Sequence, residues 1–458
     1  MDQSLQFDPS LLRKYDVRGP RYTSYPTAPQ FASSFDEQAY RALAAERLKA
    51  GPMSLYVHIP FCRTVCFYCG CNKVITANYK RADDYLTRLE REMRLQGELF
   101  GQRQVTQLHF GGGTPTYLNE DDLRRVFDDL HRHFALSDSA AREFSIEIDP
   151  RTVTPEKIAL LGELGFNRMS LGVQDFDQAV QIAVNRIQSV EQTQAALEAG
   201  RANGFRSTNI DLIYGLPKQT LASFDRTLNT VLELRPERLA VYSYAHLPQM
   251  FKVQRQIKAE ELPDAETKLA LLELTIQRLT AAGYVYIGMD HFALPDDELA
   301  RAQREGTLQR NFQGYSTQAE LDLVGLGVSA IGKIGNAYAQ NLKMLDTYGE
   351  AVDAGKLAIM HGVRMSADDV LRRDLIQSLM CQDRIDIPRL ERDHDIDFGR
   401  YFASELERLE PLAADGLISI DDRSIQVLPR GRLLLRNVAM VFDAYLKPDG
   451  GTRFSRAI

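Results

Sequence analysis

The sequence predicts an α/β protein, built as a partial (β/α)6-type barrel that follows an N-terminal arm and precedes a mainly helical, winged-helix-like domain. Short apolar runs rich in β-forming residues alternate with longer segments of helical spacing. This alternation is typical of parallel strands joined by helices. The 458 residues are too many for one small core. We expect residues 1–50 to form the arm and a lead-in helix, 51–350 the barrel with an extension, and 351–458 the C-terminal domain.

Six apolar runs provide the expected barrel strands: residues 54–60, 105–110, 143–149, 167–173, 207–214 and 238–244. The segments between these runs have apolar residues at the intervals expected of helices. Tyr85, Leu89 and Met93 are four residues apart and therefore share one helix face, and residues 220–234 have the same spacing. In such folds ligands bind at the carboxyl ends of the strands. We therefore expect the polar residues near these ends to line one pocket.

The region after about residue 350 has a different pattern. Residues 367–381, 398–416 and 430–446 predict helices, and residues 417–428 predict a β-hairpin. Helices beside a hairpin are typical of a winged-helix module, which suggests DNA binding. We favour a lid or scaffold role, because the segment is slightly acidic and lacks the basic face that phosphates require.

Composition excludes several classes of protein. A net charge of -7 argues against a general nucleic-acid binder. The chain has no run of 18 or more apolar residues, so we expect no membrane span. Its first residues, MDQSLQFDPS, lack the basic and apolar regions of a signal peptide. We expect a cytoplasmic protein, in which thiols stay reduced.

Four of the five cysteines lie in the stretch CRTVCFYCGC, from Cys62 to Cys71. A zinc site usually uses two ligand pairs separated by a dozen or more residues, which this stretch does not provide. A redox dithiol of Cys66 and Cys69 leaves the other two cysteines unexplained. An iron–sulfur cluster is held by thiolates at short spacings such as these. We favour a [4Fe–4S] cluster on Cys62, Cys66 and Cys69, which leaves one iron open to another ligand.

The CxxxCxxC spacing resembles the radical S-adenosylmethionine (SAM) superfamily, and GGGTPT at 111–116 strengthens the resemblance. In that superfamily the open iron chelates SAM, and an electron from the cluster cleaves SAM to a 5′-deoxyadenosyl radical. The segments YVHIPFC, CGCNK, FGGGTPTYL, NIDLIYGLPKQT and GPRYTSYPTA resemble, more narrowly, the family of oxygen-independent coproporphyrinogen III oxidases (dehydrogenases). This resemblance covers nearly the whole chain.

The resemblance implies an enzyme of haem biosynthesis. That family decarboxylates two propionates of coproporphyrinogen III oxidatively to vinyls, giving protoporphyrinogen IX without O2. A carbon radical can abstract the unactivated propionate hydrogen, whereas no protein side chain can. The alternative is a haem-chaperone-like radical SAM protein that binds haem without decarboxylating anything. The family further implies two SAM molecules and a small flavodoxin- or ferredoxin-type electron donor. We expect a monomer with no nucleic-acid or membrane partner.

The resemblance also assigns residues. Cys62, Cys66 and Cys69 match the cluster ligands, and Cys71 matches a fourth cysteine that is not a ligand and that we expect to take part in catalysis. The positions that match contacts to the first SAM are Tyr56, Gly112, Glu147 and Ile331. Those that match contacts to the second are Tyr68, Gly113, Thr114, Gln174, Arg186, Asp211 and Ala245. Carboxylates suit ribose hydroxyls, and an arginine suits the SAM carboxylate.

The N-terminal stretch GPRYTSYPTA predicts a packed arm that covers a barrel end. We expect its Arg21 and Tyr22 to reach the substrate, because a substrate with four carboxylates requires Arg or Lys partners. Arg310 and the loop 311–317 are similar candidates. Cys381 lies on a predicted apolar helix face and is expected to be a buried thiol.

Overall fold

The computed structural model describes residues 5–318 and 320–446, which form two compact units. The barrel unit comprises residues 31–275 and 320–364, and the terminal unit comprises the described residues up to 30, 276–318 and from 365 onward. Each unit combines segments that are distant in the sequence. The sequence instead predicted domains made of continuous segments, with boundaries at 50/51 and 350/351, and these boundaries stay a prediction.

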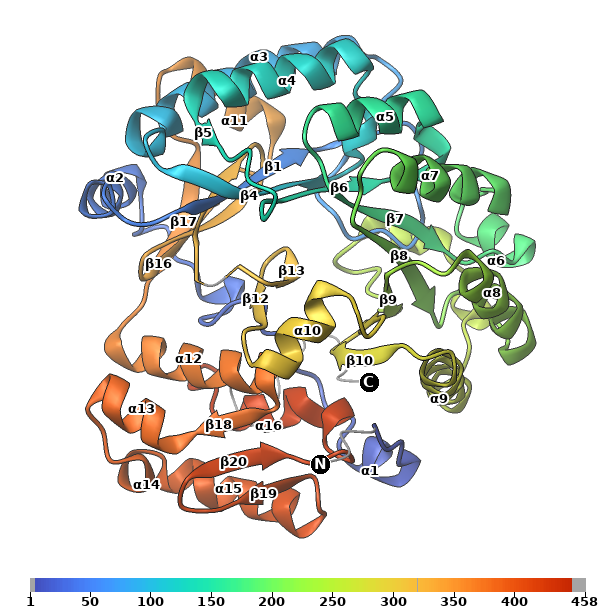
Figure 1. Cartoon of the computed structure of the whole chain (residues 1–458), viewed down its shortest axis with the longest axis vertical. Coiled ribbons are helices and arrows are strands. Elements are labelled where there is room, and N and C mark those ends of the chain that lie inside the picture. The colour runs from blue at the N-terminus through green and yellow to red at the C-terminus, as the bar shows by residue number, and fades with distance from the viewer. Residues whose placement is uncertain (1–4, 319, 447–458) are drawn as a thin grey trace. The chain divides into compact units, whose positions relative to one another are not determined.

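Six parallel strands form the centre of the barrel unit (Figure 1). They are β1 (Met53–Ile59), β4 (Gln104–Gly112), β6 (Glu143–Ile148), β7 (Arg168–Gln174), β8 (Ser207–Tyr214) and β9 (Arg238–Ser243). Each pairs in parallel with the next along the chain. The six predicted strands are therefore confirmed, and their carboxyl ends lie at one edge of the sheet.

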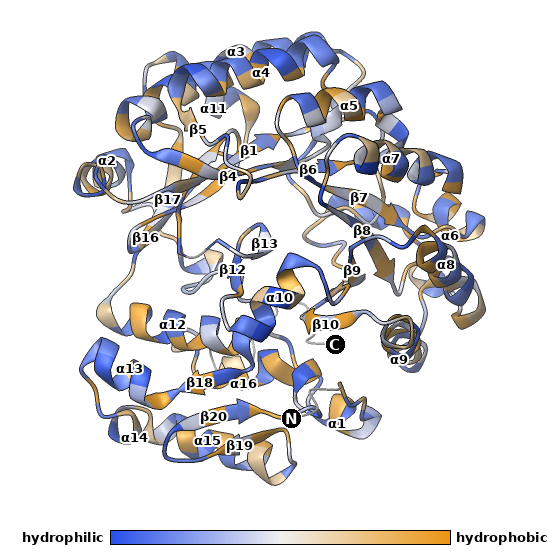
Figure 2. Ribbon diagram, in the orientation of Figure 1, coloured by the Kyte–Doolittle hydropathy of each residue, from blue (hydrophilic) through white to orange (hydrophobic). Residues whose placement is uncertain are grey.

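Helices cover one face of these strands. Figure 1 shows α3 (Lys80–Phe100), α4 (Glu120–His133), α5 (Pro155–Glu163) and α7 (Val190–Ala202) along the outside of the sheet, and α8 (Leu221–Leu234) follows β8. The predicted stripe of Tyr85, Leu89 and Met93 is buried on α3. Figure 2 shows that α3 and α4 are mostly hydrophilic on their outer surface. The helices thus bury an apolar face against the sheet and turn their charged face outward.

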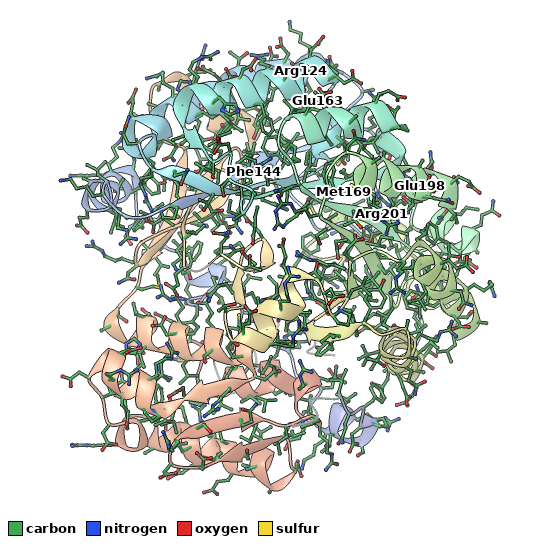
Figure 3. The ribbon with its side chains drawn as sticks, in the orientation of Figure 1. Arg124, Phe144, Glu163, Met169, Glu198 and Arg201 are labelled. Carbon is green, nitrogen blue, oxygen red and sulfur yellow. The ribbon has the colours of Figure 1, made fainter. Side chains whose placement is uncertain are left out.

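Apolar burial, rather than surface ion pairing, holds these layers together. Phe144 of β6 and Met169 of β7, labelled in Figure 3, are both buried. Arg124 of α4 and Glu163 of α5 meet at 3.4 Å, but more than half of each side chain is exposed. An exposed pair of this kind contributes at most about 1 kcal/mol, whereas burying one large apolar side chain contributes about 1.5–3 kcal/mol.

The sheet of the barrel unit continues beyond β1 through strands that the sequence did not reveal. β14 (Asp322–Leu326) pairs in parallel with β1, and β15 (Ile331–Ile334), β16 (Ala337–Asn341) and β17 (Ile359–Arg364) follow in antiparallel order. All five residues of β14 are buried. A short strand without alternation of exposed and buried residues has no recognisable period, so only an unspecified extension was predicted here.

Asp322, at the start of β14, belongs to a buried ion pair. Its carboxylate accepts from Arg103 at 2.7 Å, from Arg47 at 3.1 Å and from the Gly335 amide at 2.7 Å. The Arg103 and Asp322 side chains are only 3% and 2% exposed. We expect Asp322→Ala to lower the free energy of unfolding by about 3–5 kcal/mol, because the Arg103 charge then stays buried without its partner. Denaturant unfolding measures this loss.

The control is Asp353→Ala. Asp353 pairs with Arg88 and Arg91 while 37% of its side chain is exposed, so the loss of unfolding free energy is expected to stay below about 1 kcal/mol. Equal losses in the two variants at neutral pH would contradict the prediction.

The Asp322 pair also makes stability depend on pH. Burial by itself raises the pKa of Asp322, but the Gly335 amide and the two guanidiniums outweigh burial and lower it. The contribution of the pair is therefore complete above the ordinary carboxyl pKa and is lost as the pH falls through the folded-state pKa.

The terminal unit contains the helices and the small sheet predicted near the C-terminus. α12 (Ala367–Gln382) confirms the first predicted helix, whereas the second is split into α14 (Phe398–Tyr401) and α15 (Ala403–Ala414). The hairpin of β19 (Ile418–Ile420) and β20 (Ser424–Val427) is confirmed, and β18 (Arg384–Asp386) adds a third strand. The last helix, α16 (Leu435–Val441), is shorter than predicted.

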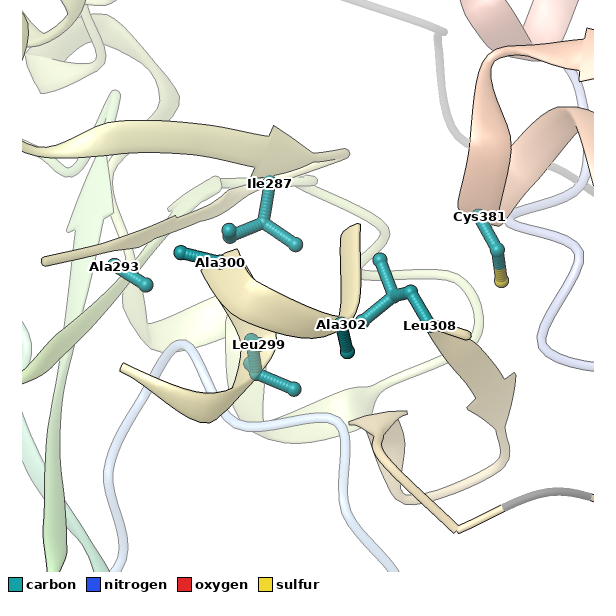
Figure 4. Packing of buried hydrophobic residues seen from close by; sticks show 7 residues of the cluster. All are labelled: Ile287, Ala293, Leu299, Ala300, Ala302, Leu308 and Cys381. Carbon is teal, nitrogen blue, oxygen red and sulfur yellow. The ribbon is translucent and has the colours of Figure 1, made fainter. Parts of the chain in front are cut away.

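Cys381 is a buried thiol, as predicted. It lies on α12 and is 3% exposed. Figure 4 shows it with the other members of one apolar cluster: Ile287, Ala293, Leu299, Ala300, Ala302 and Leu308. Burial raises the pKa of this thiol to about 12, so it stays protonated and packs as a small apolar side chain. None of the helices in the described part of the chain is long and apolar enough to cross a membrane.

Candidate active site

A cavity of about 450 Å³ opens at the carboxyl ends of the barrel strands. Its walls come from the loop after β1, from residues 112–115 at the end of β4, from residues 147–149, 151 and 152 at the end of β6, and from β7, β8 and β9. This arrangement confirms the expectation that residues near successive strand ends line one pocket. The predicted site residues on its walls are Cys62, Cys66, Tyr68, Cys69, Cys71, Gly112, Gly113, Thr114, Glu147, Gln174, Arg186 and Asp211.

The loop that carries the cysteines is closed by pairing between its two ends and is bonded to the barrel unit in between. β2 (Phe61–Cys62) pairs in parallel with β3 (Val74–Ile75), and the Val74 amide donates to the Pro60 carbonyl at 2.7 Å. Inside the loop, the Phe67 amide donates to the Val184 carbonyl at 3.0 Å. These bonds fix the positions of the thiols before any ligand binds.

The thiols have different surroundings. Cys62 Sγ lies 3.4 Å from the Thr114 hydroxyl oxygen, and burial raises the pKa of Cys62 to about 11. The interaction with the Cys71 thiol lowers the pKa of Cys69 to about 6, and the same interaction raises the pKa of Cys71 well above its usual range. Cys71 therefore contacts a predicted ligand and favours the thiolate form of that neighbour.

These residues fit an iron–sulfur cluster. Among the residues that the structure describes, no three His, Cys, Asp or Glu side chains converge as a single metal ion requires. A [4Fe–4S] cluster places its thiolate ligands on different iron atoms, so it does not require convergence on one point. The Cys62, Cys66 and Cys69 side chains instead line one cavity large enough for a multi-atom group.

A buried ionic network surrounds Cys66. Asp149 Oδ2 accepts from Arg151 Nη2 at 2.7 Å and from Arg186 Nη1 at 3.1 Å. The same two donors lie 3.8 Å and 3.5 Å from Cys66 Sγ. Burial by itself raises the pKa of Asp149, but the charges of both arginines outweigh it and hold that pKa below its usual range. Two guanidiniums are thus positioned to donate to the sulfur of one predicted cluster ligand.

The glycines after β4 permit two close approaches within the protein. Gly112 has φ +116°, and a Cβ there would lie 2.6 Å from the His58 ring. A Cβ on Gly113 would lie 2.5 Å from the Pro60 carbonyl oxygen. The sequence suggested that these glycines admit a ligand. The structure shows that they also let His58 of β1, and Pro60 just after β1, pack against the end of β4.

Two carboxylates reach the cavity from β6 and β8. Asp211 accepts from the Ser170 hydroxyl and from Asn209 Nδ2, each at 2.8 Å, and burial raises the pKa of Asp211 to about 6. Glu147 accepts from the Gly112 amide at 3.2 Å, and 47% of its side chain is exposed. Glu147 is therefore accessible to a ligand's hydroxyl groups, and Asp211 is held in one orientation by its two donors.

Gln174 and Arg186 shape the wall formed by β7. Gln174 adopts φ +72° at a bulge in the pairing of β7 with β8, and this left-handed conformation is uncommon for a residue other than glycine. Arg186 Nη2 donates to the Gly172 carbonyl. Arg186 Nε is buried and has no hydrogen-bond partner within the described part of the chain, so one donor of this side chain is available for a ligand.

Tyr56, Ala245 and Ile331 do not line this cavity. The Tyr56 hydroxyl lies 3.0 Å from His58 Nδ1, and its ring stacks on His109 with centroids 5.8 Å apart. Ile331 begins β15. Ala245 follows β9, and its carbonyl accepts from Gln254 at 3.3 Å. Their predicted roles in SAM binding stay predictions.

Two residues that sequence reasoning missed position these segments. Gln254, which is 2% exposed, donates to the carbonyls of both Tyr68 and Ala245. Glu92 on α3 accepts from the Gly327 amide at 2.6 Å, and also from Asn341 and Tyr348. Burial raises the pKa of Glu92 to about 7. No sequence signal indicated either role, because a buried glutamine or glutamate follows no motif and its partners are distant in the chain.

Arg21 and Tyr22 lie in the terminal unit. Arg21 Nη1 forms an ion pair of 2.5 Å with Asp290, and 35% of the Arg21 side chain is exposed. Tyr22 has φ +46°, is 5% exposed and donates its hydroxyl to Asp443 at 2.9 Å. Arg21 therefore keeps exposed surface, whereas the Tyr22 hydroxyl is engaged within the protein.

Comparisons with known proteins agree with this geometry. The family model of the Radical SAM superfamily matches residues 56–231, and that of the HemN C-terminal domain matches residues 365–434. Oxygen-independent coproporphyrinogen III oxidases of Salmonella typhimurium and Pseudomonas aeruginosa are each 51% identical to this chain over 100% of both sequences. The solved structure of coproporphyrinogen III oxidase (HemN) from Escherichia coli, described as a radical SAM enzyme, is 50% identical. It superposes with a TM-score of 0.93 over 97% of this chain and 100% of that one.

Proposed function

This chain belongs to the oxygen-independent coproporphyrinogen III oxidase family of the radical SAM superfamily, and on that premise we propose its reaction. It decarboxylates two propionates of coproporphyrinogen III oxidatively to vinyls and gives protoporphyrinogen IX in haem biosynthesis. The observation that carries this proposal is the similarity to such oxidases over the full length of the chain. The cysteine-lined cavity at the strand ends provides the place for the chemistry.

The cofactors of the superfamily are a [4Fe–4S] cluster and SAM. Cys62, Cys66 and Cys69 would hold the cluster, and the cavity residues from Gly112 to Arg186 would hold SAM beside it. When bound, these groups would supply a carbon radical that takes a hydrogen atom from the propionate β-carbon; the resulting substrate radical then has to give one electron to an acceptor as it loses CO2 and becomes a vinyl group.

The residues of the chain have definable tasks in that reaction. Arg151 and Arg186 donate to the Cys66 sulfur, and hydrogen bonds to ligand sulfurs help to set the potential of such a cluster. Cys71 lowers the pKa of Cys69 and thereby stabilises a ligand thiolate. Glu147 and Asp211 offer carboxylates to ribose hydroxyls.

The proposal extends to details beyond family membership. We place two SAM molecules in each chain, the first at Tyr56, Gly112, Glu147 and Ile331, and the second at Tyr68, Gly113, Thr114, Gln174, Arg186, Asp211 and Ala245. Six of the seven residues of the second set line the cavity, which supports a second molecule there. We also propose a flavodoxin- or ferredoxin-type electron donor, a monomeric state and a cytoplasmic location. Arg21 is proposed to contact substrate. That Tyr22 also reaches the substrate stays a prediction, and its hydroxyl is bonded to Asp443 in this structure.

Turnover under argon tests the proposed reaction. The reconstituted protein is supplied with coproporphyrinogen III, SAM and a chemical reductant, and the products are oxidised and separated as porphyrins. We expect protoporphyrin, with a tricarboxylate intermediate that rises and then falls. Stable binding of haem by the holoprotein, with no decarboxylation over many hours, would overturn the proposal in favour of a haem chaperone.

A further inference from the structure

The terminal unit contains a group of arginines that the proposed function does not yet explain. Arg310 lies on β12 (Gln309–Asn311), Arg436 on α16, and Arg21 on the N-terminal arm. Burial and the charges of Arg21 and Arg310 together lower the pKa of Arg436 to about 10. The charges of Arg21 and Arg310 thus both act on Arg436, whose guanidinium also donates to the Pro20 carbonyl next to Arg21. An anion bound beside these cations would be stabilised by their charges.

The acidic residues around this group are already engaged. Asp290 forms its 2.5 Å ion pair with Arg21, and Asp383 pairs with Arg432 at 2.9 Å. Asp443 accepts the Tyr22 hydroxyl. In the part of the chain that the structure describes, Arg310 has no ion pair with any of them. The positive charge of Arg310 thus has no direct counter-charge among the described residues, whereas Arg21 is paired with Asp290.

Two donors of Arg310 are also unused. Its Nε and Nη1 atoms are buried and have no hydrogen-bond partner among the described residues. An unsatisfied buried donor on a charged group costs about 1–3 kcal/mol or more, and most buried donors in folded proteins have a partner. Arg310 therefore carries both an uncompensated charge and free donors, which is the condition expected of a binding site awaiting an anion.

Arg310 is held in place by an aromatic platform. Its guanidinium lies over the Tyr315 ring, 4.7 Å from the centroid. The Tyr315 hydroxyl donates to the Met380 carbonyl at 3.0 Å, and its ring meets His291 edge-on at 5.3 Å. At Gly288, a Cβ would lie 2.5 Å from that hydroxyl, so glycine admits the ring. A guanidinium fixed in advance loses little conformational entropy when it binds a carboxylate.

The N-terminal arm is fixed beside the same group. Arg436 Nε donates to the Pro20 carbonyl at 3.0 Å, and Arg436 also donates to the Gly19 carbonyl. The Tyr22 side chain is anchored at Asp443. Arg21, between these two anchors, is held in place while part of its side chain remains exposed.

We propose that Arg310 and Arg21 form a binding site for a carboxylate, which takes one propionate of the tetrapyrrole substrate, and that Arg436 is a positioning residue for the arm. This inference rests on the proposed function, which supplies a substrate with four carboxylates. Two of these remain in the product, so the enzyme needs groups that recognise propionates without reacting with them. A guanidinium on a rigid platform meets that need.

The test measures binding and turnover separately. The dissociation constant of coproporphyrin III, the stable aromatic form of the substrate, is measured by fluorescence titration of the holoenzyme under argon. KM and kcat are measured with coproporphyrinogen III. We expect Arg310→Gln to raise the dissociation constant and KM by about 10- to 100-fold, because it removes one charged hydrogen-bonding group, and to change kcat far less. Arg310→Lys keeps the charge but loses the planar guanidinium, so its dissociation constant and KM are expected to lie between those of the wild type and those of Arg310→Gln.

Two controls make the result specific. Arg392→Gln removes the same charge from a side chain of the terminal unit that is 70% exposed, and it is expected to match the wild type. Coproporphyrin III tetramethyl ester lacks the carboxylates. The wild type is expected to prefer the acid over the ester, and Arg310→Gln is expected to lose much of that preference. Circular dichroism and the melting temperature confirm that each variant is folded.

The inference is overturned if Arg310→Gln binds the acid within twofold of the wild type, or if it loses affinity equally for the acid and the ester. It is also overturned if Arg310→Lys and Arg310→Gln both fail to fold while Arg392→Gln folds, since Arg310 would then be a structural residue. These outcomes are distinct from failure of the proposed function, in which the wild type itself forms no protoporphyrinogen.

Discussion

Cys66→Ser is expected to abolish the iron–sulfur cluster and all turnover. Cys66 is the middle of three thiols that line the cavity, and a serine hydroxyl is a poor ligand for the iron of such a cluster. The loss is read directly, as iron and sulfide per chain after anaerobic reconstitution and as the electron paramagnetic resonance (EPR) signal of the reduced protein. We expect less than about a tenth of the wild-type signal and no SAM-dependent change in it.

Two other cysteines serve as matched controls. Cys381→Ser alters a thiol that is 3% exposed and lies in the terminal unit, so the cluster is expected to form normally. Cys71→Ser removes a thiol that lines the cavity and lowers the pKa of Cys69. It is expected to retain most of the iron but to lose activity. Full iron content and a SAM-sensitive signal in Cys66→Ser would refute the ligand assignment.

The barrel strands were predictable because their signal is local. Each of the six runs has the length and the apolar, β-forming composition of a buried parallel strand, and each ends near a polar residue. The extension was not predictable in the same way. β15, with the sequence IGKI, and β16, with AYAQN, are short, and their pairing depends on β14 being held beside β1 by contacts from distant parts of the chain. The break between α14 and α15 at Phe402 also lies inside a continuous helical pattern.

The same distinction between local and long-range signals decides which residues of the candidate site could be predicted. The cysteine spacing and the glycine run are local motifs, and the structure brings them together on one cavity. Arg151 carried no signal, because its role depends on Asp149 and on a sulfur 85 residues away. Glu92 and Gln254 likewise act through partners that only the fold brings near. A motif thus identifies groups that meet a ligand, whereas the residues that orient those groups become visible only in three dimensions.

Arg186→Gln is expected to lower kcat/KM by at least about 100-fold. The Arg186 guanidinium bonds to Asp149, to the Gly172 carbonyl and to the Cys66 sulfur, and its side chain is 8% exposed. Removing one partner from a buried charged network costs about 3–5 kcal/mol, which corresponds to a factor of about 10² to 5 × 10³. Arg186 lines the cavity, so we expect its replacement to weaken SAM binding and to give an EPR signal that responds less to added SAM.

The Arg103→Gln variant distinguishes a role of Arg186 in SAM binding from a role in stability alone. Arg103 is also a buried arginine paired with an aspartate, its side chain being 3% exposed, but it does not line the cavity. Both variants are expected to melt at lower temperature, because each leaves an aspartate with a weakened network. Only Arg186→Gln is expected to lose the SAM response at a temperature where both are folded, and Arg186→Lys should restore part of it by keeping the charge. If Arg103→Gln loses the SAM response equally, Arg186 acts through stability alone and its place in the SAM site is wrong.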